Sequence, residues 1–301
     1  MPQKFREYAY DPSAGAAIVA IVCFCLTSAL HTWQLARTRS WSFIPLTIGG
    51  YLEIIGYACR LVASYQSPNF TRSPFIVETV LILVAPAFFS ASIYMLLGRI
   101  IRIVDGESRS IISRRWLTKI FVLGDVISLF LQAIGGVLIT QKDADKIDHG
   151  KKIVDAGLFT QIASFGFFVV TATAFHIRLT LNPTAASLTK NNPWRKHLYA
   201  LYVTSILILV RCIVRVVEYL QGVSGYIMTH EVFIYVFDFL LMFIVMVIFN
   251  IIHPSEIYAI LRGGGKVSKY CRTKQYDIAM LERRELETVE TGQAWESNAL
   301  R

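Results

Sequence analysis

Long apolar runs separated by short polar segments make up most of this chain. Each run is close to or above the ~20 residues that an α-helix needs to cross the hydrocarbon of a bilayer. The segments between the runs carry the charged, Pro and Gly residues that are typical of turns. The pattern therefore predicts seven transmembrane helices, over Ser13–Leu35, Phe43–Ser64, Phe75–Ile101, Leu117–Thr140, Ile153–Leu179, Leu198–Leu220 and Val232–His253.

Composition supports this fold class. The chain is 54% hydrophobic and only 17% charged, whereas a soluble domain carries about 25% charged residues. The first run is of spanning length and its N-terminal flank mixes both signs of charge, so we expect it to be a retained helix and not a cleaved signal peptide. We predict an all-α integral membrane protein with a short N-terminus (1–12), a seven-helix domain (13–254) and a basic tail (255–301).

The distribution of Lys and Arg predicts the orientation. The formal net charge is +9, and it collects in the loops after the first, third and fifth runs and in the tail. The positive-inside rule then places the N-terminus outside and the C-terminus in the cytoplasm, and the charge needs no nucleic-acid partner. Asn69 begins the triplet Asn-Phe-Thr in a predicted outside loop and is a candidate glycosylation site. We expect a multi-pass protein of the plasma membrane.

Ionisable residues interrupt several of the runs at helical spacing. Arg211, Arg215 and Glu218 follow an i, i+4, i+7 pattern, which places them on one helical face. A charge in hydrocarbon costs at least ~2.5–3.5 kcal/mol, so such residues usually face a bundle interior or a water-filled cavity. We predict that one polar centre is lined by Glu53, Arg60, Asp125, Gln132, Gln161, Arg211, Arg215, Glu218, Glu231 and Asp238.

This polar centre allows two interpretations. Its opposite charges can form a buried network that fixes the register of the helices. Alternatively, its members surround a cavity, open outward or to the outer leaflet, that receives a substrate. Asp125 has no basic residue three or four positions away, whereas Arg215 and Glu218 can pair locally. Asp125 is therefore the better candidate to receive a cationic head group or a proton.

Other motifs change the picture little. Pro86 lies in the middle of the third run and predicts a helix kink. The six His residues form no H-E-x-x-H or H-x-x-x-H pair, and no G-x-S-x-G elbow or phosphate-binding loop is present. We therefore expect neither catalytic residues nor a metal or cofactor site, and a membrane hydrolase is the least favoured hypothesis.

The intramembrane residues also carry a family resemblance. In order along the chain the motifs are Tyr10-x-Pro12-Ser13, Glu53-x-x-Gly56-Tyr57-x-x-Arg60, Ala85-Pro86 with Ala91-x-x-Tyr94 and Arg99, Asp125-x-x-Ser128-x-x-x-Gln132-x-x-Gly135-Gly136, Gly157-x-x-x-Gln161, Arg211-x-x-x-Arg215-x-x-Glu218-x-x-x-Gly222, and Glu231, Tyr235, Asp238 and His253-Pro254. Together they resemble the fungal RTA-like, lipid-translocating exporter family over Tyr10 to Pro254. The resemblance implies a seven-helix membrane protein linked to export of sphingoid long-chain bases, resistance to toxic lipids or movement of porphyrins.

Two hypotheses of function follow. The first is a transporter of amphipathic lipids, with sphingoid long-chain bases as one candidate, or of toxic lipophilic compounds. The second is a seven-helix receptor or lipid sensor, although no D-R-Y-like or N-P-x-x-Y-like sequence stands at the inner ends of the third and seventh runs. Both make membrane lipids the expected partners.

Overall fold

The computed structural model describes residues 10–66, 71–139, 141, 143–189, 192–222, 225–261, 266–269 and 272–275. The long helices are α1 (Ala14–Thr38), α2 (Ile44–Tyr65), α3 (Arg72–Ile103), α4 (Arg114–Ile139), α5 (Ala144–Leu181), α7 (Trp194–Gln221) and the pair η3 (Ile234–Leu240) and α9 (Leu241–Ile251). The short elements are η1 (Trp41–Phe43), η2 (Glu107–Arg109), α6 (Ala185–Leu188), α8 (Tyr226–Thr229), α10 (Ser255–Leu261), and the antiparallel strands β1 (Lys266–Lys269) and β2 (Arg272–Gln275).

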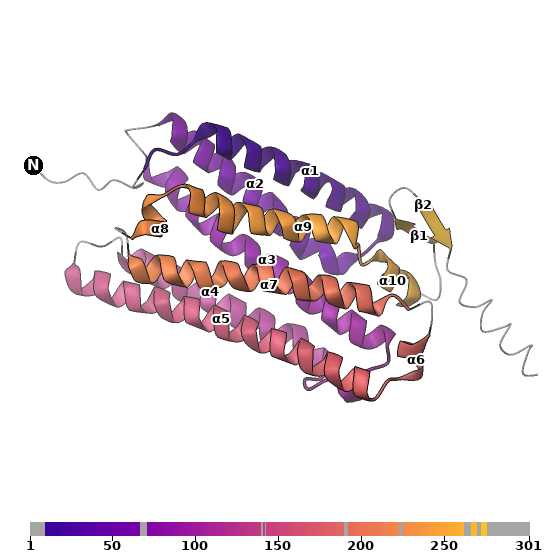
Figure 1. Ribbon diagram of the computed structural model, residues 1–301. Coiled ribbons are helices and arrows are strands. Elements are labelled where there is room, and N and C mark those ends of the chain that lie inside the picture. The colour runs from indigo at the N-terminus through magenta and orange to yellow at the C-terminus, as the bar shows by residue number, and fades with distance from the viewer. Residues whose placement is uncertain are drawn as a thin grey trace, which may run out of the picture.

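The long helices form one bundle of roughly parallel and antiparallel rods (Figure 1). Seven of the described helices are long and apolar enough to cross a membrane, which confirms the predicted fold class. The chain enters the bundle at one end, and α10 lies at the opposite end (Figure 1). We call these the Tyr10 end and the Tyr258 end, after the residues that precede α1 and lie in α10.

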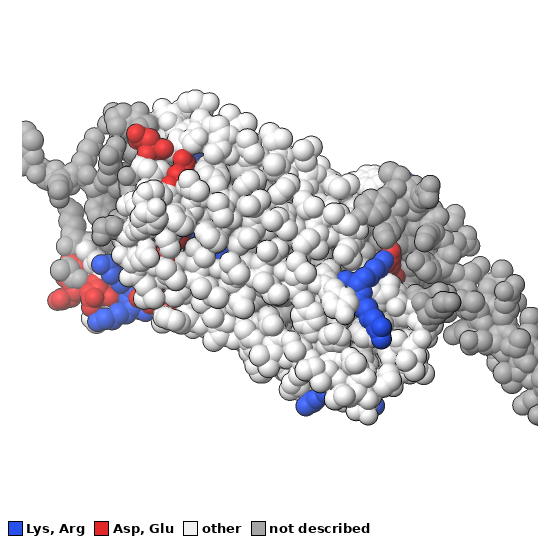
Figure 2. All heavy atoms as spheres, in the orientation of Figure 1, with Lys and Arg blue, Asp and Glu red and all other residues white. Residues whose placement is uncertain are grey.

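The outer surface of the bundle is suited to lipid. Figure 2 shows Lys, Arg, Asp and Glu gathered at the two ends, with a broad band almost free of charge between them. Large apolar side chains are exposed on the long helices, among them Leu26 of α1 and Phe130 and Val137 of α4. Their exposure would be unfavourable in water but is not in hydrocarbon, so the band is the membrane-facing surface.

Small residues allow the helices to approach closely. A Cβ atom added to Gly49 of α2 would lie 2.5 Å from a ring carbon of Phe89 in α3. A Cβ atom added to Gly50 would lie 2.4 Å from Ser28 Oγ of α1. In membranes, where helices gain little from hydrophobic burial against each other, such close packing is a main source of association. These contacts hold α2 between α1 and α3.

Two boundaries differ from the sequence-based expectation. Helix α5 begins at Ala144 and not at Ile153, because the Asp143 side chain caps it by accepting the Asp145 N–H, and Lys152 pairs with Asp148 one turn away at 2.7 Å. The predicted polar loop is therefore largely helical, extending beyond the apolar run. At the other end, α10 packs with Ile257 fully buried, so the packed part of the chain continues past residue 254.

Pro86, where the sequence predicts a kink, lies inside helix α3. Helix α3 continues through this residue, and Ser90 Oγ donates to the Pro86 carbonyl at 3.0 Å. The kink stays a prediction.

The candidate glycosylation residue, Asn69, lies outside the described residues.

Candidate functional site

A buried arginine organises the Tyr10 end of the bundle. The Arg60 side chain, from the last turns of α2, is only 1% exposed. Its guanidinium donates to Glu78 of α3 at 2.6 Å and to Glu231, which precedes η3, at 2.8 Å. It also donates to the hydroxyls of Tyr10 at 2.9 Å and Tyr235 at 3.1 Å. We call these five residues the Arg60 cluster.

The Arg60 cluster also fixes the start of the bundle. Both carboxylate oxygens of Glu231 accept the backbone N–H of Ser13, at 2.9 and 3.1 Å, where α1 begins. Burial raises the pKa of the Tyr10 phenol above its usual value, although the nearby Arg60 guanidinium acts in the opposite direction. The phenol therefore stays neutral at physiological pH. Through one guanidinium, α2 and α3 are joined to the segments that begin the first and last spans.

A second group of charges lies deeper in the bundle, between α7 and η3. Arg211 Nε lies 2.9 Å from Asp238 Oδ1, and Arg215 Nε lies 3.3 Å from the same oxygen. Arg215 also pairs with Glu218 at 2.8 Å, as the i, i+3 spacing predicts. Arg211 further donates to the Ile82 carbonyl of α3 at 2.9 Å. With Glu53, these four charged residues form what we call the central cluster.

Glu53 differs from the other members of the central cluster. It is 0% exposed, and neither carboxylate oxygen has a hydrogen-bond partner among the described residues. The charges that act on it most strongly are Arg211, Asp238 and Arg215. A buried carboxyl group without hydrogen bonds is costly, which sets Glu53 apart from the paired charges around it.

The backbone of the last span is irregular at this level. Residues Ile234–Leu240 form a π-helix, and Asp238 is its one buried residue. Single π-helical turns cost backbone stability and occur frequently at functional sites. Here the wider turn carries the carboxylate that both Arg211 and Arg215 contact. The sequence pattern did not indicate this irregularity.

Asp125 lies in a separate place, between α4 and α3. It is 3% exposed, and its Oδ2 atom accepts a hydrogen bond from Tyr94 of α3 at 2.9 Å. Its Oδ1 atom has no hydrogen-bond partner among the described residues. Among the described residues, Asp125 forms no ion pair with a member of the central cluster.

The predicted residues thus fall into distinct groups. Glu53, Arg211, Arg215, Glu218 and Asp238 come together, and Arg60 and Glu231 meet nearer the end of the bundle. Gln132 Nε2 of α4 donates to Gln161 Oε1 of α5 at 3.2 Å. These polar side chains lie in the interior of the bundle: Arg60, Arg211 and Asp238 are at most 4% exposed. The cavity around them stays a prediction.

Sequence reasoning missed two partners. Glu78 is the acid that neutralises Arg60 most closely, and it is 3% exposed. It lies near the start of the third predicted span, where an acidic residue is easily read as interfacial. Tyr94, the hydrogen-bond donor to Asp125, appeared only as part of the family motif. An unpaired intramembrane Arg or Asp in the sequence is the signal that such a partner must exist.

These features define a class of protein: a seven-helix integral membrane protein with ionisable groups buried in its core. The chain matches the model of the family described as RTA1 like protein over residues 46–260. It belongs to that family.

Named relatives extend the comparison. The chain is 37% identical to Protoporphyrin uptake protein 1 of Saccharomyces cerevisiae, over 82% of this chain and 91% of the relative. It is 35% identical to Protein RTA1 of the same yeast, over 83% and 85%. It is also 26% identical to the Sphingoid long-chain base transporter RSB1, over 81% and 72%. No solved structure matches the chain.

Proposed function

We propose that this protein moves amphipathic lipids across a membrane without covalent change, and that Glu53 and Asp125 handle the polar head group or a coupled proton. The observation that carries the proposal is that these two buried carboxyl groups have oxygens without hydrogen-bond partners among the described residues. Buried charges that are fully paired can serve to hold the helices together. A buried carboxyl group without hydrogen bonds lowers stability, so we take its presence as a sign that it binds something.

The names of the relatives support this class of substrate. One relative is a sphingoid long-chain base transporter and another is a protoporphyrin uptake protein. A sphingoid base combines an ammonium group with a long apolar chain. Its ammonium would pair with the carboxylate of Asp125 or Glu53, while its chain stays in lipid. We therefore propose a cationic amphiphile, such as a sphingoid long-chain base, as the first substrate to test.

The Arg60 cluster gives the proposed transport a gate. It joins α2 and α3 to the beginnings of α1 and η3 by ion pairs and hydrogen bonds, and its charged side chains are buried or nearly so. Passage of a head group past this end requires those contacts to separate. We propose that the structure is the state closed at the Tyr10 end, and that transport alternates between this state and one in which the cluster is broken.

Reconstitution tests the proposal directly. The full-length protein is placed in liposomes with a fluorescently labelled long-chain base, and a membrane-impermeant quencher reports how much of the base has changed leaflet. Wild-type protein should raise the initial rate by at least about tenfold over empty liposomes, a barrier change of ~1.4 kcal/mol. Glu53→Gln and Asp125→Asn should return the rate to near the empty-liposome value.

A matched control separates site from general acidity. Asp148→Asn removes an acid that is exposed at the Tyr10 end and paired with Lys152, and it should leave the rate unchanged. Equal loss in all three variants would reject Glu53 and Asp125 as the site. Saturable binding of the base without any movement between leaflets would favour a lipid sensor over a transporter.

We also propose an orientation, with the Tyr10 end outside and the Tyr258 end in the cytoplasm, in the plasma membrane. Loop charge asymmetry supports it. Epitope tags at each terminus of the full chain, exposed to protease on sealed cells, test it. The N-terminal tag should be removed and the C-terminal tag protected, and the reverse pattern would overturn the orientation.

A further inference from the structure

Three histidines are buried toward the Tyr258 end of the bundle, and the proposed transport site uses none of them. His31 of α1, His197 of α7 and His253, which follows α9, are each at most 4% exposed. The ring centroids of His31 and His253 are 6.4 Å apart. His197 Nε2 lies 3.4 Å from Glu256 Oε2 of α10, and the same oxygen pairs with Lys196. Titratable groups from three helices and from the segment after α9 therefore meet at this end.

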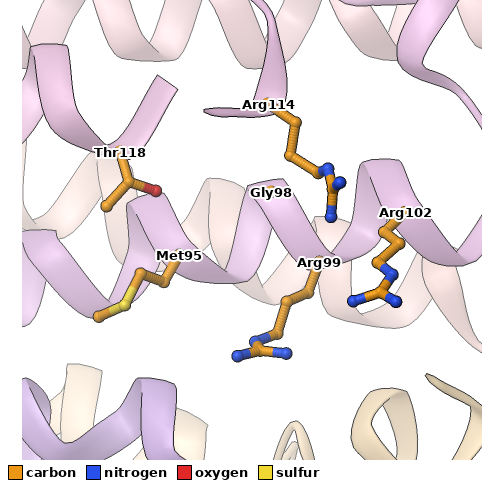
Figure 3. Close-up of a pocket in the computed structure, with 6 residues that line it drawn as sticks. All are labelled: Met95, Gly98, Arg99, Arg102, Arg114 and Thr118. Atoms are coloured by element: carbon orange, nitrogen blue, oxygen red, sulfur yellow. The ribbon is translucent and has the colours of Figure 1, made fainter. Parts of the chain in front are cut away.

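Helix α10 is packed into the Tyr258 end of the bundle (Figure 1). Its Ile257 side chain is fully buried. The hydroxyl of Tyr258 accepts the backbone N–H of Ser42 in η1 at 2.8 Å. The Arg99 side chain leaves α3 on the side opposite Arg114 (Figure 3), and its guanidinium carbon lies 4.0 Å from the centroid of the Tyr258 ring. Together with the ion pair to α7, these contacts hold α10 against three other elements.

His253 stands at the junction between α9 and α10, beyond the last spanning helix, which ends at Ile251. Residues 252–254 are not helical, and Pro254 cannot continue the hydrogen bonding of α9 because it has no backbone N–H. His253 Nδ1 accepts the backbone N–H of Ser255, the first residue of α10, at 3.3 Å.

This hydrogen bond determines where the His253 ring carries its proton. A ring nitrogen that accepts a hydrogen bond has no proton, so the proton of the neutral ring is on Nε2. Nε2 has no hydrogen-bond partner among the described residues. Nδ1 is therefore both the acceptor that holds the start of α10 and the one nitrogen of this ring that can take up a further proton.

We propose that α10 is a second gate, at the Tyr258 end, and that a proton taken up from water by His253 Nδ1 releases it from the bundle. Protonation turns Nδ1 from an acceptor into a donor, so it faces the donor N–H of Ser255 and the hydrogen bond is lost. It also places a positive charge beside the His31 ring, where burial makes a charge unfavourable. Rotation of α10 about residues 252–254 brings the charged ring to water. The inference rests on the transport function proposed above, in which the Arg60 cluster gates the opposite end.

The surroundings of His253 determine how the gate responds to pH. Burial is the main cause that lowers the pKa of His253 to about 3, with His31 and His197 acting in the same direction and Glu256 in the opposite one. An exposed imidazole has a pKa of about 6.5. The closed gate therefore has its full stability above about pH 6.5, and the ratio of closed to open protein falls about tenfold for each pH unit from there toward pH 3. The titratable and charged groups of the described residues around this end are His31, Arg99, Lys196, His197, Glu256 and Tyr258.

The distance between two spin labels on the full-length protein in detergent tests the gate, because this readout does not itself depend on pH. One label is attached at Leu261, the last residue of α10, and the other at Leu181, which is exposed at the end of α5, after the five native cysteines are replaced by Ala. Between pH 7.5 and pH 5.5 the ratio of open to closed protein should rise about tenfold. His253→Asn keeps an oxygen that accepts the Ser255 N–H but cannot take up a proton, so it should stay closed at both pH values.

A histidine outside this group provides the matched control. His176 lies in the last turns of α5, where its ring contacts Trp194. His176→Gln should keep the pH response within about twofold of the unsubstituted protein. Loss of the response in this control, or its persistence in folded His253→Asn, would overturn the proposal. If His253→Asn folds poorly, the unsubstituted protein decides: an open-to-closed ratio that is the same at both pH values would overturn the gate.

The leaflet-exchange assay separates this inference from the transport function on which it rests. Movement of the labelled long-chain base should be faster at pH 5.5 than at pH 7.5, and His253→Asn should lose most of that difference. A pH response of the spin labels without any movement of the base would reject transport and keep the pH-dependent release of α10. Movement of the base without a response of the spin labels would reject the gate alone.

Discussion

The Arg60 cluster and the pair of carboxyl groups at Glu53 and Asp125 are both buried in the same bundle, but their hydrogen bonding is opposite. Arg60 donates to two carboxylates and two hydroxyls from other segments of the chain. Glu53 has no hydrogen-bond partner among the described residues, and one oxygen of Asp125 lacks one as well. Each set has charge in a region that excludes water.

The difference separates scaffold from site. Removing one partner from a satisfied network leaves the others buried and unpaired, so the cost falls on folding. Neutralising a carboxyl group that has few partners costs folding little, because few contacts are lost. The same kind of substitution should therefore reduce stability in the first region and transport in the second. The predictions below are ordered by their expected effect on the free energy of unfolding.

The largest effect is expected for Arg60→Gln. It leaves Glu78 charged and buried without its closest partner, at a cost of about 3–5 kcal/mol. Unfolding of the purified protein by heat or denaturant measures this, along with the amount that reaches the cell surface. The double variant Arg60→Gln/Glu78→Gln should recover part of the loss, because it removes the uncompensated charge. No recovery would show that Arg60 acts through its other contacts.

A smaller effect is expected for Arg215→Gln. This side chain is 11% exposed and its partner Glu218 is 15% exposed, so water compensates part of the lost pair. Loss of a hydrogen bond to a charged group should cost about 1.5–3 kcal/mol, and the amount of folded protein should fall. The same unfolding measurement applies. A loss of unfolding free energy as large as that of Arg60→Gln would show that Arg215 is as important for stability as Arg60.

Tyr10→Phe should have a smaller effect still. The substitution removes one hydroxyl that accepts from Arg60 but keeps the ring, whose centroid lies 5.5 Å from the guanidinium carbon. We expect a loss of about 0.5–1.5 kcal/mol and, because the gate is weakened, an unchanged or faster leaflet-exchange rate. A slower rate in a folded variant would argue against the Arg60 cluster as a gate.

Asp125→Asn should change stability least and transport most. The amide oxygen of Asn can still accept from Tyr94, so we expect a loss below ~1 kcal/mol. Normal expression and membrane insertion should accompany near-complete loss of long-chain-base movement and of resistance to added long-chain base in cells. Tyr94→Phe is the comparison, because it keeps the acid and removes its donor. Normal transport by Asp125→Asn would assign Asp125 to the scaffold.

The sequence predicted the spanning helices well, because the length of an apolar run is enough to identify them. All seven spans were found, because a run of about 20 apolar residues has few other stable environments. It failed at Ala144–Lys152, where a polar segment is helical through an Asp143 cap and local ion pairs. It also stopped the domain short of α10, whose burial depends on contacts with distant helices.

For the site, the sequence alone determined which residues must avoid lipid, because the cost of an exposed charge in hydrocarbon does not depend on the fold. Helical spacing further predicted the Arg215–Glu218 pair. Only the tertiary structure decided that Arg60 pairs with Glu78 and Glu231, that Asp238 lies on a π-helical turn, and that Glu53 has no hydrogen-bond partner among the described residues. Those outcomes depend on which helices are neighbours and at what depth, and packing between distant segments sets both.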